Sequence, residues 1–370
     1  MTKDLPKILF ILHMPPPIHG ASIMGQYIYE SKIINNSFEC KYINLGTAKN
    51  LEDIGKAGLK KIYSFFIMLM QIKKVIQSFN PDVVYVTPNA TGISFLKDFL
   101  VVRMIKSQRV KVVAHYHNKG VAAYQDKFIY NFCYKRFFKD LNIILLADVL
   151  HEDLKKYVNK RDINVCPNGI PLPNKINNVE KKDNLAIPHI LFLSNLIKSK
   201  GIFILLGACK ILKDKGFSFV CEIIGGETQE IDRNVLNDKI AELKLQDSVI
   251  YHGKKYGEEK NTYLQNASLF VFPTFYSKEC FPVVLLEAMQ YGIPCISTDE
   301  AGIPAIIEHG KTGLLCRRQS VDDLADAMEK LLDDPELAAR LGSNGYQKYL
   351  DSFTIGSFEN KIKEILSSLI

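Results

Sequence analysis

A two-lobed α/β fold, with a parallel sheet in each lobe, is predicted by two features of the sequence. Short runs rich in apolar and β-branched residues alternate with helical patterns, which is typical of parallel sheets built from βαβ units. The 370 residues, 47% of them hydrophobic, suffice for two cores of ordinary size. The expected strands are Ile8–Leu12, Val83–Thr87, Val110–His115, Ile143–Ala147, Ile190–Ser194, Val220–Ile224, Val249–His252, Leu269–Pro273 and Cys295–Thr298.

The boundary between the lobes is predicted near residue 175. Between Cys166 and Pro188 the alternation breaks into a Pro-Asn-Gly turn, further prolines and a charged stretch, as in a linker. Residues 1–175 then form the N-terminal lobe and residues 176–354 the C-terminal lobe. The last helical stretch, Ser357–Leu369, follows a break and is compatible with packing on either lobe.

The charge is uneven between the two halves. Residues 1–175 hold 25 Lys and Arg against 13 Asp and Glu, whereas residues 176–370 hold 22 against 27. The segments Leu59–Phe79 and Tyr124–Phe138 combine basic with aromatic and aliphatic residues. An anionic membrane, a lipid phosphate or a nucleic acid would suit such a lobe. A basic surface selected for solubility, with aromatic side chains in the core, is the alternative.

A cytoplasmic location is expected from the segments that the sequence lacks. Met1–Asp4 do not start a signal peptide, and the apolar stretch Phe65–Met70 falls far short of the roughly 20 residues of a membrane span. Eight scattered cysteines, without metal-binding spacing, suggest reduced and mostly buried thiols.

Ligands of open α/β sheets bind beyond the carboxyl ends of the strands. The first such segment, His13–Ser22, carries three prolines and leads through Gly20 into a small-residue helix start that can face an anion. It lacks the glycine fingerprint of a dinucleotide site, so a nicotinamide dehydrogenase is the least favoured function. A rigid turn without a ligand is the alternative.

Two histidines, His115 and His117, follow the strand that begins at Val110. They share a face if the strand continues through both. No acidic residue or cysteine lies nearby in the sequence, so a hydrogen-bonding or acid/base role near a substrate is favoured over a metal site. A structural histidine is the alternative.

The C-terminal lobe carries the stronger signals. Lys200 and Gly201 precede an apolar helix, a setting that suits a diphosphate. Glu279 lies in a loop before a helix that Pro282 can start, and Glu287 lies within that otherwise apolar helix. A carboxylate in such surroundings needs partners, and the vicinal hydroxyls of a ribose or a hexose are suitable.

These residues resemble the retaining glycosyltransferases of family 4, which have the GT-B fold of two Rossmann-like lobes facing across a cleft. The defining motif is two glutamates separated by seven residues, matched by Glu279 and Glu287. The surroundings agree: Pro273, Glu287–Met289, Gly292–Pro294, Gly302, Glu308 and Thr312–Gly313. The resemblance implies that Glu279 contacts the donor sugar, that Glu287 binds the ribose, and that the last helix, about 355–370, returns to the N-terminal lobe.

The resemblance assigns further residues. Lys200 and Gly201 look like the phosphate-binding pair, Gly225 like the glycine ending the next strand, and His117, with His115 as a rival, like the histidine near the donor hexose. Asn195 stands where the family usually has arginine, and Cys280 and Pro282 replace smaller residues. The expected site is therefore His117 and Glu279 for catalysis, with Gly20, Asn195, Lys200, Gly225, Phe281, Val283 and Glu287 for the donor.

The expected reaction is transfer of a sugar from a nucleoside diphosphate to an acceptor hydroxyl, with retention of configuration and without a metal or other cofactor. The donor would bind the C-terminal lobe and a glycan or lipid-linked glycan the N-terminal lobe, for cell-surface polysaccharide or glycolipid synthesis. Peripheral contact with an anionic membrane, at the inner face of the cell membrane, is expected, and nucleic acid is not expected as a partner. A nucleotide-sugar epimerase, a sugar-phosphate synthase and a nucleotide-sugar-binding protein without transferase activity are the alternatives.

Overall fold

The computed structural model describes residues 5–16, 20–45, 59–173 and 187–370, with the side chains of 59–62 excepted. The middle of the proline loop, 17–19, and the charged linker, 174–186, lie outside the described residues. Contacts divide the chain into unit 1, Met1–Gly169 with Ile355–Ile370, and unit 2, Ile170–Thr354. The boundary that we predicted was residue 175, with 355–370 returning to the first unit.

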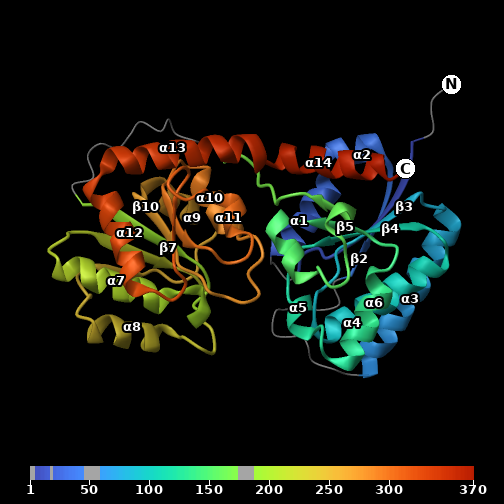
Figure 1. The fold of residues 1–370 in the computed structure, drawn as a ribbon, viewed down its shortest axis with the longest axis horizontal. Coiled ribbons are helices and arrows are strands. Elements are labelled where there is room, and N and C mark those ends of the chain that lie inside the picture. The colour runs from blue at the N-terminus through green and yellow to red at the C-terminus, as the bar shows by residue number, and fades with distance from the viewer. Residues whose placement is uncertain (1–4, 17–19, 46–58, 174–186) are drawn as a thin grey trace. The chain divides into compact units, whose positions relative to one another are not determined.

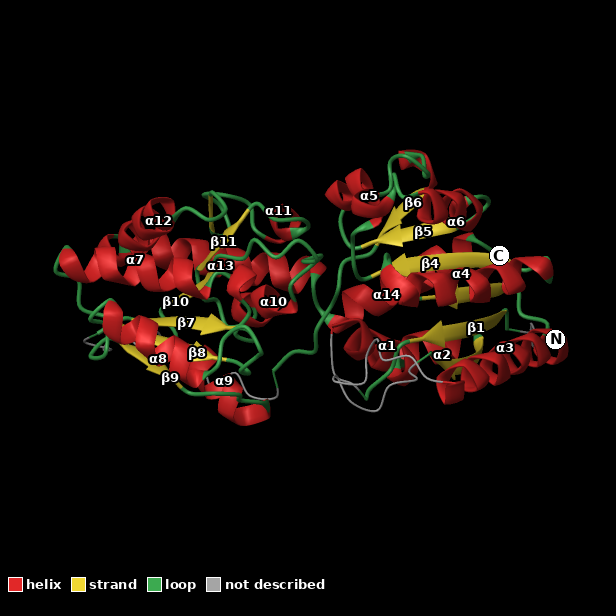
Figure 2. Ribbon diagram, turned by 90° about the horizontal axis from the view of Figure 1, so that it is seen from below, coloured by secondary structure: helices red, strands yellow, loops and turns green. Residues whose placement is uncertain are grey.

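Unit 1 is built on a parallel six-stranded sheet in the order β2-β1-β3-β4-β5-β6 (Figures 1 and 2). The strands are β1 (Lys7–Leu12), β2 (Glu39–Asn44), β3 (Val83–Val86), β4 (Lys111–Tyr116), β5 (Asn142–Leu145) and β6 (Ile163–Val165). The inner strands read as continuous apolar runs because helices cover both of their faces. The register pairs Ile8 of β1 with Val83 of β3.

Two groups of helices cover the sheet of unit 1. The helices are α1 (Gly20–Glu30), α2 (Lys32–Ser37), α3 (Leu59–Phe79), α4 (Gly92–Ser107), α5 (Val121–Tyr124), α6 (Phe128–Phe138) and α14 (Ile355–Ser368), with 3₁₀ turns η2 (Asp148–Asp153) and η3 (Lys160–Asp162). Helices α1, α2 and α14 share one core with β1 and β3. Helices α3, α4 and α6 pack side by side on the opposite face (Figure 1).

Unit 2 also has a parallel six-stranded sheet, in the order β12-β11-β10-β7-β8-β9. Its strands are β7 (His189–Leu193), β8 (Val220–Ile224), β9 (Val249–Tyr251), β10 (Leu269–Phe272), β11 (Cys295–Thr298) and β12 (Leu314–Cys316). Its helices are η4 (Lys198–Lys200), α7 (Ile202–Asp214), α8 (Arg233–Glu242), α9 (Gly257–Asn266), α10 (Val283–Met289), α11 (Ile303–Ile306), α12 (Val321–Asp333) and α13 (Pro335–Ser352). Helix α12 packs on α7 and α13 on α10.

All nine predicted strands are present, and β2, β6 and β12 were missed. Each missed strand lies at an edge of its sheet. An edge strand is covered less completely, and β2 accordingly has only Ile43 buried while no residue of β6 is fully buried. Their sequences therefore lack the continuous apolar run by which a central strand is found.

Candidate functional site

The strand order of unit 2 indicates where a ligand can bind at the carboxyl ends of its strands. Counted along the chain, the order is 3-2-1-4-5-6, and the direction of winding reverses between β7 and β10. The loops that leave two such strands diverge, so a crevice for ligands opens at their carboxyl ends. The segment after β7 carries Lys200, and the segment after β10 carries Glu279.

Lys200 and Glu279 form an ion pair at this reversal. The Lys200 ammonium lies 2.5 Å from Glu279 Oε2, and their side chains are only 16% and 10% exposed. The two loops are also joined through the backbone, where Phe275 N–H donates to Ser199 C=O at 2.8 Å. The structure thus brings together two residues that the sequence predicted separately.

A glycine allows the loops to come this close. Gly201 has φ +90°, and a Cβ at this position would lie 2.2 Å from the carbonyl oxygen of Pro273. Any other residue would be strained in the left-handed region and would push the two loops apart. Gly201 also caps α7, whose free N–H groups therefore begin directly beside Lys200.

Aromatic rings complete the surroundings of Lys200. Its ammonium lies 4.6 Å from the ring centroid of Tyr276 and 5.4 Å from that of Phe272. Burial, followed by the nearby Glu279 carboxylate, raises the pKa of Tyr276. Partial burial of a lysine beside a helix N-terminus is a setting in which an anionic ligand is held with little competition from water.

Glu287 has a lysine partner of its own. It sits on α10 between fully buried neighbours, and Lys260 Nζ of α9 donates to its Oε1 at 2.7 Å. The side chains are 19% and 23% exposed, so the pair borders the surface. The sequence predicted that Glu287 needs a partner, but it missed Lys260, which stands in a polar helix without any distinguishing spacing.

Phe281 and Val283 contribute to the site mainly through their position. The Phe281 ring is buried and packs edge-on against Phe353, 5.7 Å between centroids. Val283 is the first residue of α10, with Pro282 as its cap. The Phe281 side chain therefore belongs to the core, and its backbone is what remains for contact with a ligand.

Asn195 and the two glycines after β8 form a second contact between loops. The Asn195 side-chain oxygen accepts from Gly226 N–H at 3.2 Å. A Cβ on Gly225 would lie 1.6 Å from the Ser194 carbonyl oxygen, so only glycine fits there. The Asn195 amide thus holds the β7 and β8 loops together.

Lys254, which was not predicted from the sequence, lies close to Asn195 and Gly226. A Cβ built on Gly226 would be 2.2 Å from Lys254 Cε and 3.0 Å from Asn195 Oδ1. The end of the Lys254 side chain is therefore within about 5 Å of Asn195, by addition of those two distances. Lys254 follows β9, so a third loop brings positive charge to the same sheet edge.

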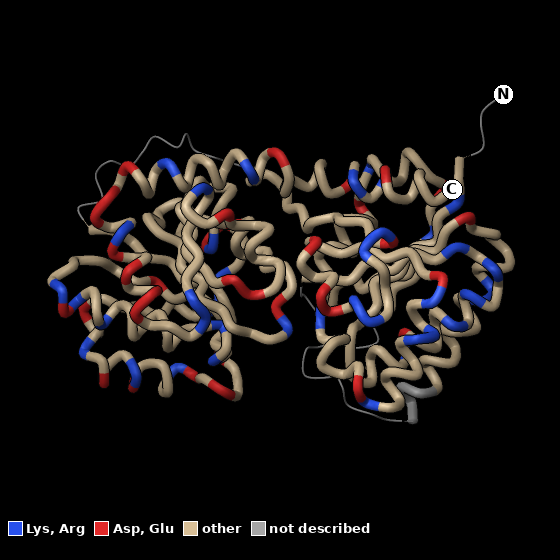
Figure 3. The backbone as a smooth tube through the Cα atoms, in the orientation of Figure 1, with Lys and Arg blue, Asp and Glu red and all other residues tan. Residues whose placement is uncertain are grey.

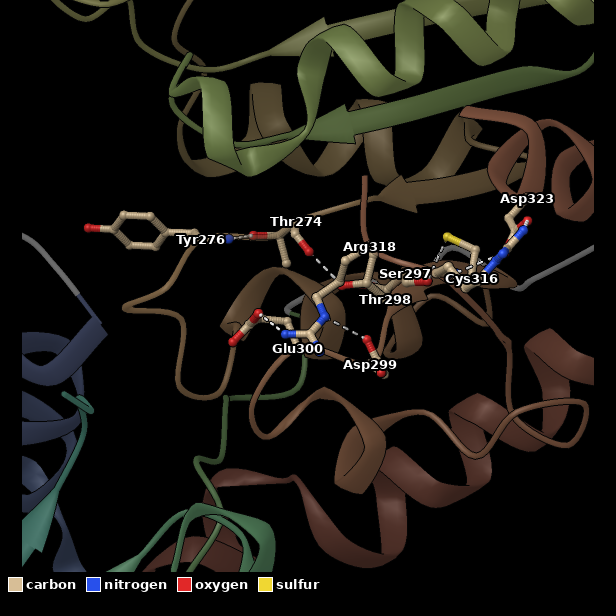
Figure 4. A network of polar contacts seen from close by, with 10 residues as sticks. Thr274, Tyr276, Ser297, Thr298, Asp299, Glu300, Cys316, Arg318 and Asp323 are labelled. Atoms are coloured by element: carbon tan, nitrogen blue, oxygen red, sulfur yellow. Dashed lines mark hydrogen bonds and ion pairs between the residues drawn. The ribbon is translucent and has the colours of Figure 1, made fainter. Parts of the chain in front are cut away.

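A polar network fixes the loops on the other side of the reversal (Figure 4). Thr298 Oγ1 donates to the Thr274 carbonyl at 2.5 Å, and Arg318 bridges Asp299 and Glu300 at 3.0 Å each. Gly302 N–H donates to the carbonyl of Cys280 at 2.9 Å. The loop that carries Glu279 is therefore held by the turn after β11.

In unit 1, the two histidines occupy different environments. His115 is fully buried, and its Nδ1 lies 2.6 Å from the Tyr85 hydroxyl. Burial, with a smaller effect of His117, lowers the pKa of His115 well below its usual value. His117 is half-buried just beyond the end of β4, with Nδ1 3.2 Å from Asn168 Oδ1. Of the two rivals, His117 is the one nearer the surface.

Unit 1 has its own reversal, between β1 and β3. His13 N–H donates to Thr87 Oγ1 at 3.2 Å, and the Asn89 amide lies 3.4 Å from the His13 ring. Asp98 accepts from Asn89 twice, and burial raises the pKa of Asp98 to about 7. Gly20 is the first residue of α1, with open space where a Cβ would be. Asn89 and Asp98 were missed, since neither follows its strand directly.

No group of three or more His, Cys, Asp or Glu side chains is placed to hold a metal ion within residues 5–16, 20–45, 59–173 and 187–370. The helices that the structure describes include none with the length and hydropathy of a membrane span.

Comparison with known proteins adds a family. Residues 175–348 match the family model described as glycosyl transferases group 1. The amylovoran biosynthesis glycosyltransferase AmsK of Erwinia amylovora is 36% identical over 174 residues, which cover 46% of this chain and 42% of that protein. The capsular polysaccharide biosynthesis glycosyltransferase CapM of Staphylococcus aureus is 27% identical, over 46% and 43% of the two chains. The chain thus spans less than half the length of these relatives.

Solved structures extend the likeness of fold to the whole chain. A glycosyltransferase from Rickettsia africae has a TM-score of 0.77 at 17% identity, over 99% of both chains. HepE of Anabaena, solved in complex with UDP, has a TM-score of 0.74 at 15% identity, over 98% and 100%. The predicted α/β fold of two Rossmann-like units, GT-B, is confirmed. Residues 175–348, which include Glu279 and Glu287, match the group 1 glycosyl transferase family that these two glutamates indicated.

Proposed function

We propose that this chain transfers a sugar from a nucleoside diphosphate to an acceptor hydroxyl, with retention and without a metal, in the synthesis of a cell-surface polysaccharide or glycolipid. The observation that carries the proposal is the Lys200–Glu279 pair at the strand reversal of unit 2. A diphosphate needs a cation and free N–H groups, and a hexose needs a hydrogen-bond acceptor. At this reversal the Lys200 ammonium group supplies the cation and the Glu279 carboxylate supplies the acceptor, and the two groups are in direct contact.

In the reaction, the bond between the anomeric carbon and the phosphate oxygen breaks and its electron pair leaves with the nucleoside diphosphate. The acceptor oxygen forms the new bond to the anomeric carbon, and the departing phosphate oxygen can take up the acceptor proton. Lys200 and the N–H groups at the start of α7 face the charge that develops on the leaving group. Lys254, beside Asn195, is a second cation for the same diphosphate.

The two glutamates have separate roles in this proposal. Glu279 accepts hydrogen bonds from the hydroxyls of the donor sugar, and Glu287 accepts from the ribose diol. Each carboxylate is already held by a lysine, at 2.5 Å and 2.7 Å, so it is oriented before the donor binds. In unit 1, His117 is the candidate catalytic residue, because its side chain is less buried than that of His115.

The names of the relatives support the substrate class. AmsK and CapM are named for the biosynthesis of polysaccharides, and HepE was solved with UDP and with UDP-glucose. We therefore expect a nucleotide-sugar donor and a glycan or lipid-linked glycan acceptor. We further propose that the enzyme works as a peripheral protein at the inner face of the cell membrane, where a lipid-linked acceptor would be found.

The donor class is tested by a thermal-shift panel of UDP, GDP, ADP and their sugar conjugates, because a ligand that binds the folded state raises its apparent stability. One nucleoside diphosphate and its conjugate should raise Tm, and Glu287→Ala should reduce that shift. Glu329→Gln is the matched control, since it also removes a lysine-paired carboxylate of unit 2. If none of these nucleotides shifts Tm, the protein is not a nucleotide-sugar transferase.

The role of Glu279 is tested by comparing turnover with binding. Glu279→Gln should lower kcat far more than it weakens binding of the nucleoside diphosphate, because the sugar and not the nucleotide loses its partner. Equal losses in the two quantities would contradict the assignment of Glu279 to the sugar.

A further inference from the structure

Three helices of unit 1 display an unusual share of apolar surface. Among the described residues, eighteen large hydrophobic side chains are exposed, and nine of them lie on α3, α4 and α6: Tyr63, Phe66, Ile67, Met70, Ile93, Leu100, Phe128, Ile129 and Phe132. These helices are neighbours on one face of the sheet (Figure 1). A concentration of this kind on adjacent helices marks a surface that is covered by something.

The exposed side chains are not part of the core. On α3, Phe65, Ile72 and Ile76 are buried on one side, while Phe66 and Met70 are 59% and 74% exposed on the other. Phe128 of α6 is 86% exposed. Each helix therefore has two apolar faces, of which the sheet covers only one.

Apolar and basic residues are ordered along the three helices. Each helix precedes a strand of the same parallel sheet, so the three run in the same direction. Seven of the nine exposed apolar residues lie in their first halves, and Met70 and Leu100 lie just past the middle of α3 and α4. The second halves carry the basic pairs Lys73 and Lys74, Arg103 and Lys106, Lys135 and Arg136. An apolar area therefore borders a basic belt on one face of unit 1, and the basic positions can be followed in Figure 3.

The charge on this face has one sign. In sequence the helices hold nine Lys and Arg, seven of which have described side chains, and a single acidic residue, Asp98. Asp98 is buried and accepts hydrogen bonds from Asn89, so it does not neutralise the surface. Between α4 and α6 the belt is hollowed by about 190 Å³, lined by Arg103, Lys106 and Arg136 among apolar residues. The Lys106 ammonium group donates to the carbonyl oxygens of Phe137 and Lys139, so Arg103 and Arg136 are the cations of the hollow that suit a phosphate head group.

We infer that α3, α4 and α6 form a docking face for an anionic phospholipid bilayer. The exposed apolar side chains would insert at the head-group boundary, and the basic belt would contact lipid phosphates. A neutral protein partner would not need nine cations, and a second copy of this chain would bring like charge against like charge. The inference deepens the proposed function, on which it rests, by placing the enzyme where lipid-linked acceptors lie.

The test is co-sedimentation of the full chain with vesicles of equal parts phosphatidylcholine and phosphatidylglycerol, and with vesicles of phosphatidylcholine alone. The protein should pellet with the anionic vesicles and be released by salt. Arg103→Gln with Arg136→Gln should lower the partition coefficient about 30-fold, since each basic group near such a surface contributes about a factor of five. Phe66→Ser with Met70→Ser should lower it at least about tenfold.

Matched controls lie on unit 2. Lys330→Gln with Arg340→Gln removes the same charge from exposed helix positions, and Val235→Ser removes an exposed apolar side chain. These variants should bind vesicles like the wild type. Equal binding to neutral and anionic vesicles, or equal losses in the controls, would overturn the inference. So would self-association in sedimentation velocity without vesicles that Phe66→Ser with Met70→Ser abolishes. The nucleotide thermal shift of the same samples tests the proposed function separately.

Discussion

The two strand reversals of this protein have the same origin in topology and opposite chemistry. In unit 2, the loops after β7 and β10 meet through the charged pair Lys200–Glu279. In unit 1, the loops after β1 and β3 meet through hydroxyl, amide and imidazole groups, with His13 beside Thr87 and Asn89. The topology of a parallel sheet thus determines where a ligand can bind, whereas the residues that follow the strands determine which ligand suits the site.

The difference fits a division of labour between the units. A nucleoside diphosphate is anionic and needs fixed positive charge, which unit 2 presents from Lys200, Lys254 and the start of α7. The hydroxyl groups of a glycan acceptor are uncharged and need hydrogen-bonding partners such as imidazole and amide side chains. Substitutions at the reversal of unit 2 therefore test donor binding, and substitutions at the reversal of unit 1 test the properties of the other site.

The largest effect is expected for Lys200→Met, which removes the charge from the reversal of unit 2. We expect kcat/KM to fall about 100- to 1000-fold, because a fixed group facing the leaving-group charge is lost. Initial rates with the donor identified by thermal shift measure this. Lys215→Met, which breaks the Lys215–Glu329 pair of the same unit, is the control. A loss of less than about threefold would remove Lys200 from the mechanism.

Gly201→Ala should separate the two loops of unit 2. Gly201 and Gly216 both have φ near +90°, but only Gly201 has a backbone oxygen, that of Pro273, where a Cβ would go. Gly216→Ala should cost about 1 kcal/mol of unfolding free energy from strain alone. Gly201→Ala should cost about 2 kcal/mol more, because the β10 loop must also move. Urea unfolding of both variants gives the difference, and equal costs would show that the loops are not in close contact.

Asp98 should make the stability of unit 1 sensitive to pH. Its pKa is about 7 when folded and 3.8 at its ordinary value, so the folded state holds a proton that the unfolded state has lost in between. The unfolding free energy should therefore fall as pH rises through that window, by up to about 1.4 kcal/mol per unit.

Asp98→Asn should flatten this slope, since an amide oxygen still accepts from Asn89 but does not titrate. Asp126→Asn, on an exposed side chain, should leave it unchanged. Unfolding by urea at several pH values measures how the unfolding free energy depends on pH. The same dependence in the wild type and in Asp98→Asn would show that Asp98 is not protonated in the folded state.

The smallest effect is expected for Lys254→Gln. Lys254 is exposed, so its attraction for a diphosphate is screened by water and salt. We expect nucleoside diphosphate affinity to fall about fivefold at low salt, with little difference at high salt. Lys255→Gln is the control, because that neighbour is paired with Glu259. Calorimetric titration at two salt concentrations would decide, and identical affinities would leave Lys200 as the principal cation.

The sequence predicted central strands better than edge strands, and single site residues better than their partners. Leu269–Phe272 reads as a strand because helices bury both its faces, whereas β2 and β6 at the sheet edges carry no such run. Glu287 stands out as a carboxylate among apolar neighbours. Its partner Lys260 is 27 residues away in an ordinary polar helix, and only folding brings the two together.

The same holds for Lys254 and Arg318. Each acts across loops from different strands, and neither has a spacing that distinguishes it from other surface cations. The glycines are intermediate cases. Gly225 was predicted from its place after a strand, but the reason why no other residue fits there, the Ser194 carbonyl at 1.6 Å from its would-be Cβ, is visible only in three dimensions.

The return of α14 to unit 1 has a consequence for the order in which the chain folds during synthesis. Phe358, Ile362 and Leu366 complete the core formed by β1, β3, α1 and α2. The unit whose strands leave the ribosome first therefore keeps an open apolar face until residue 366 has been made, while unit 2 can close before it. A nascent chain halted near residue 354 would expose that face to chaperones, although all the strands described above, the last of which ends at Cys316, had already been synthesised.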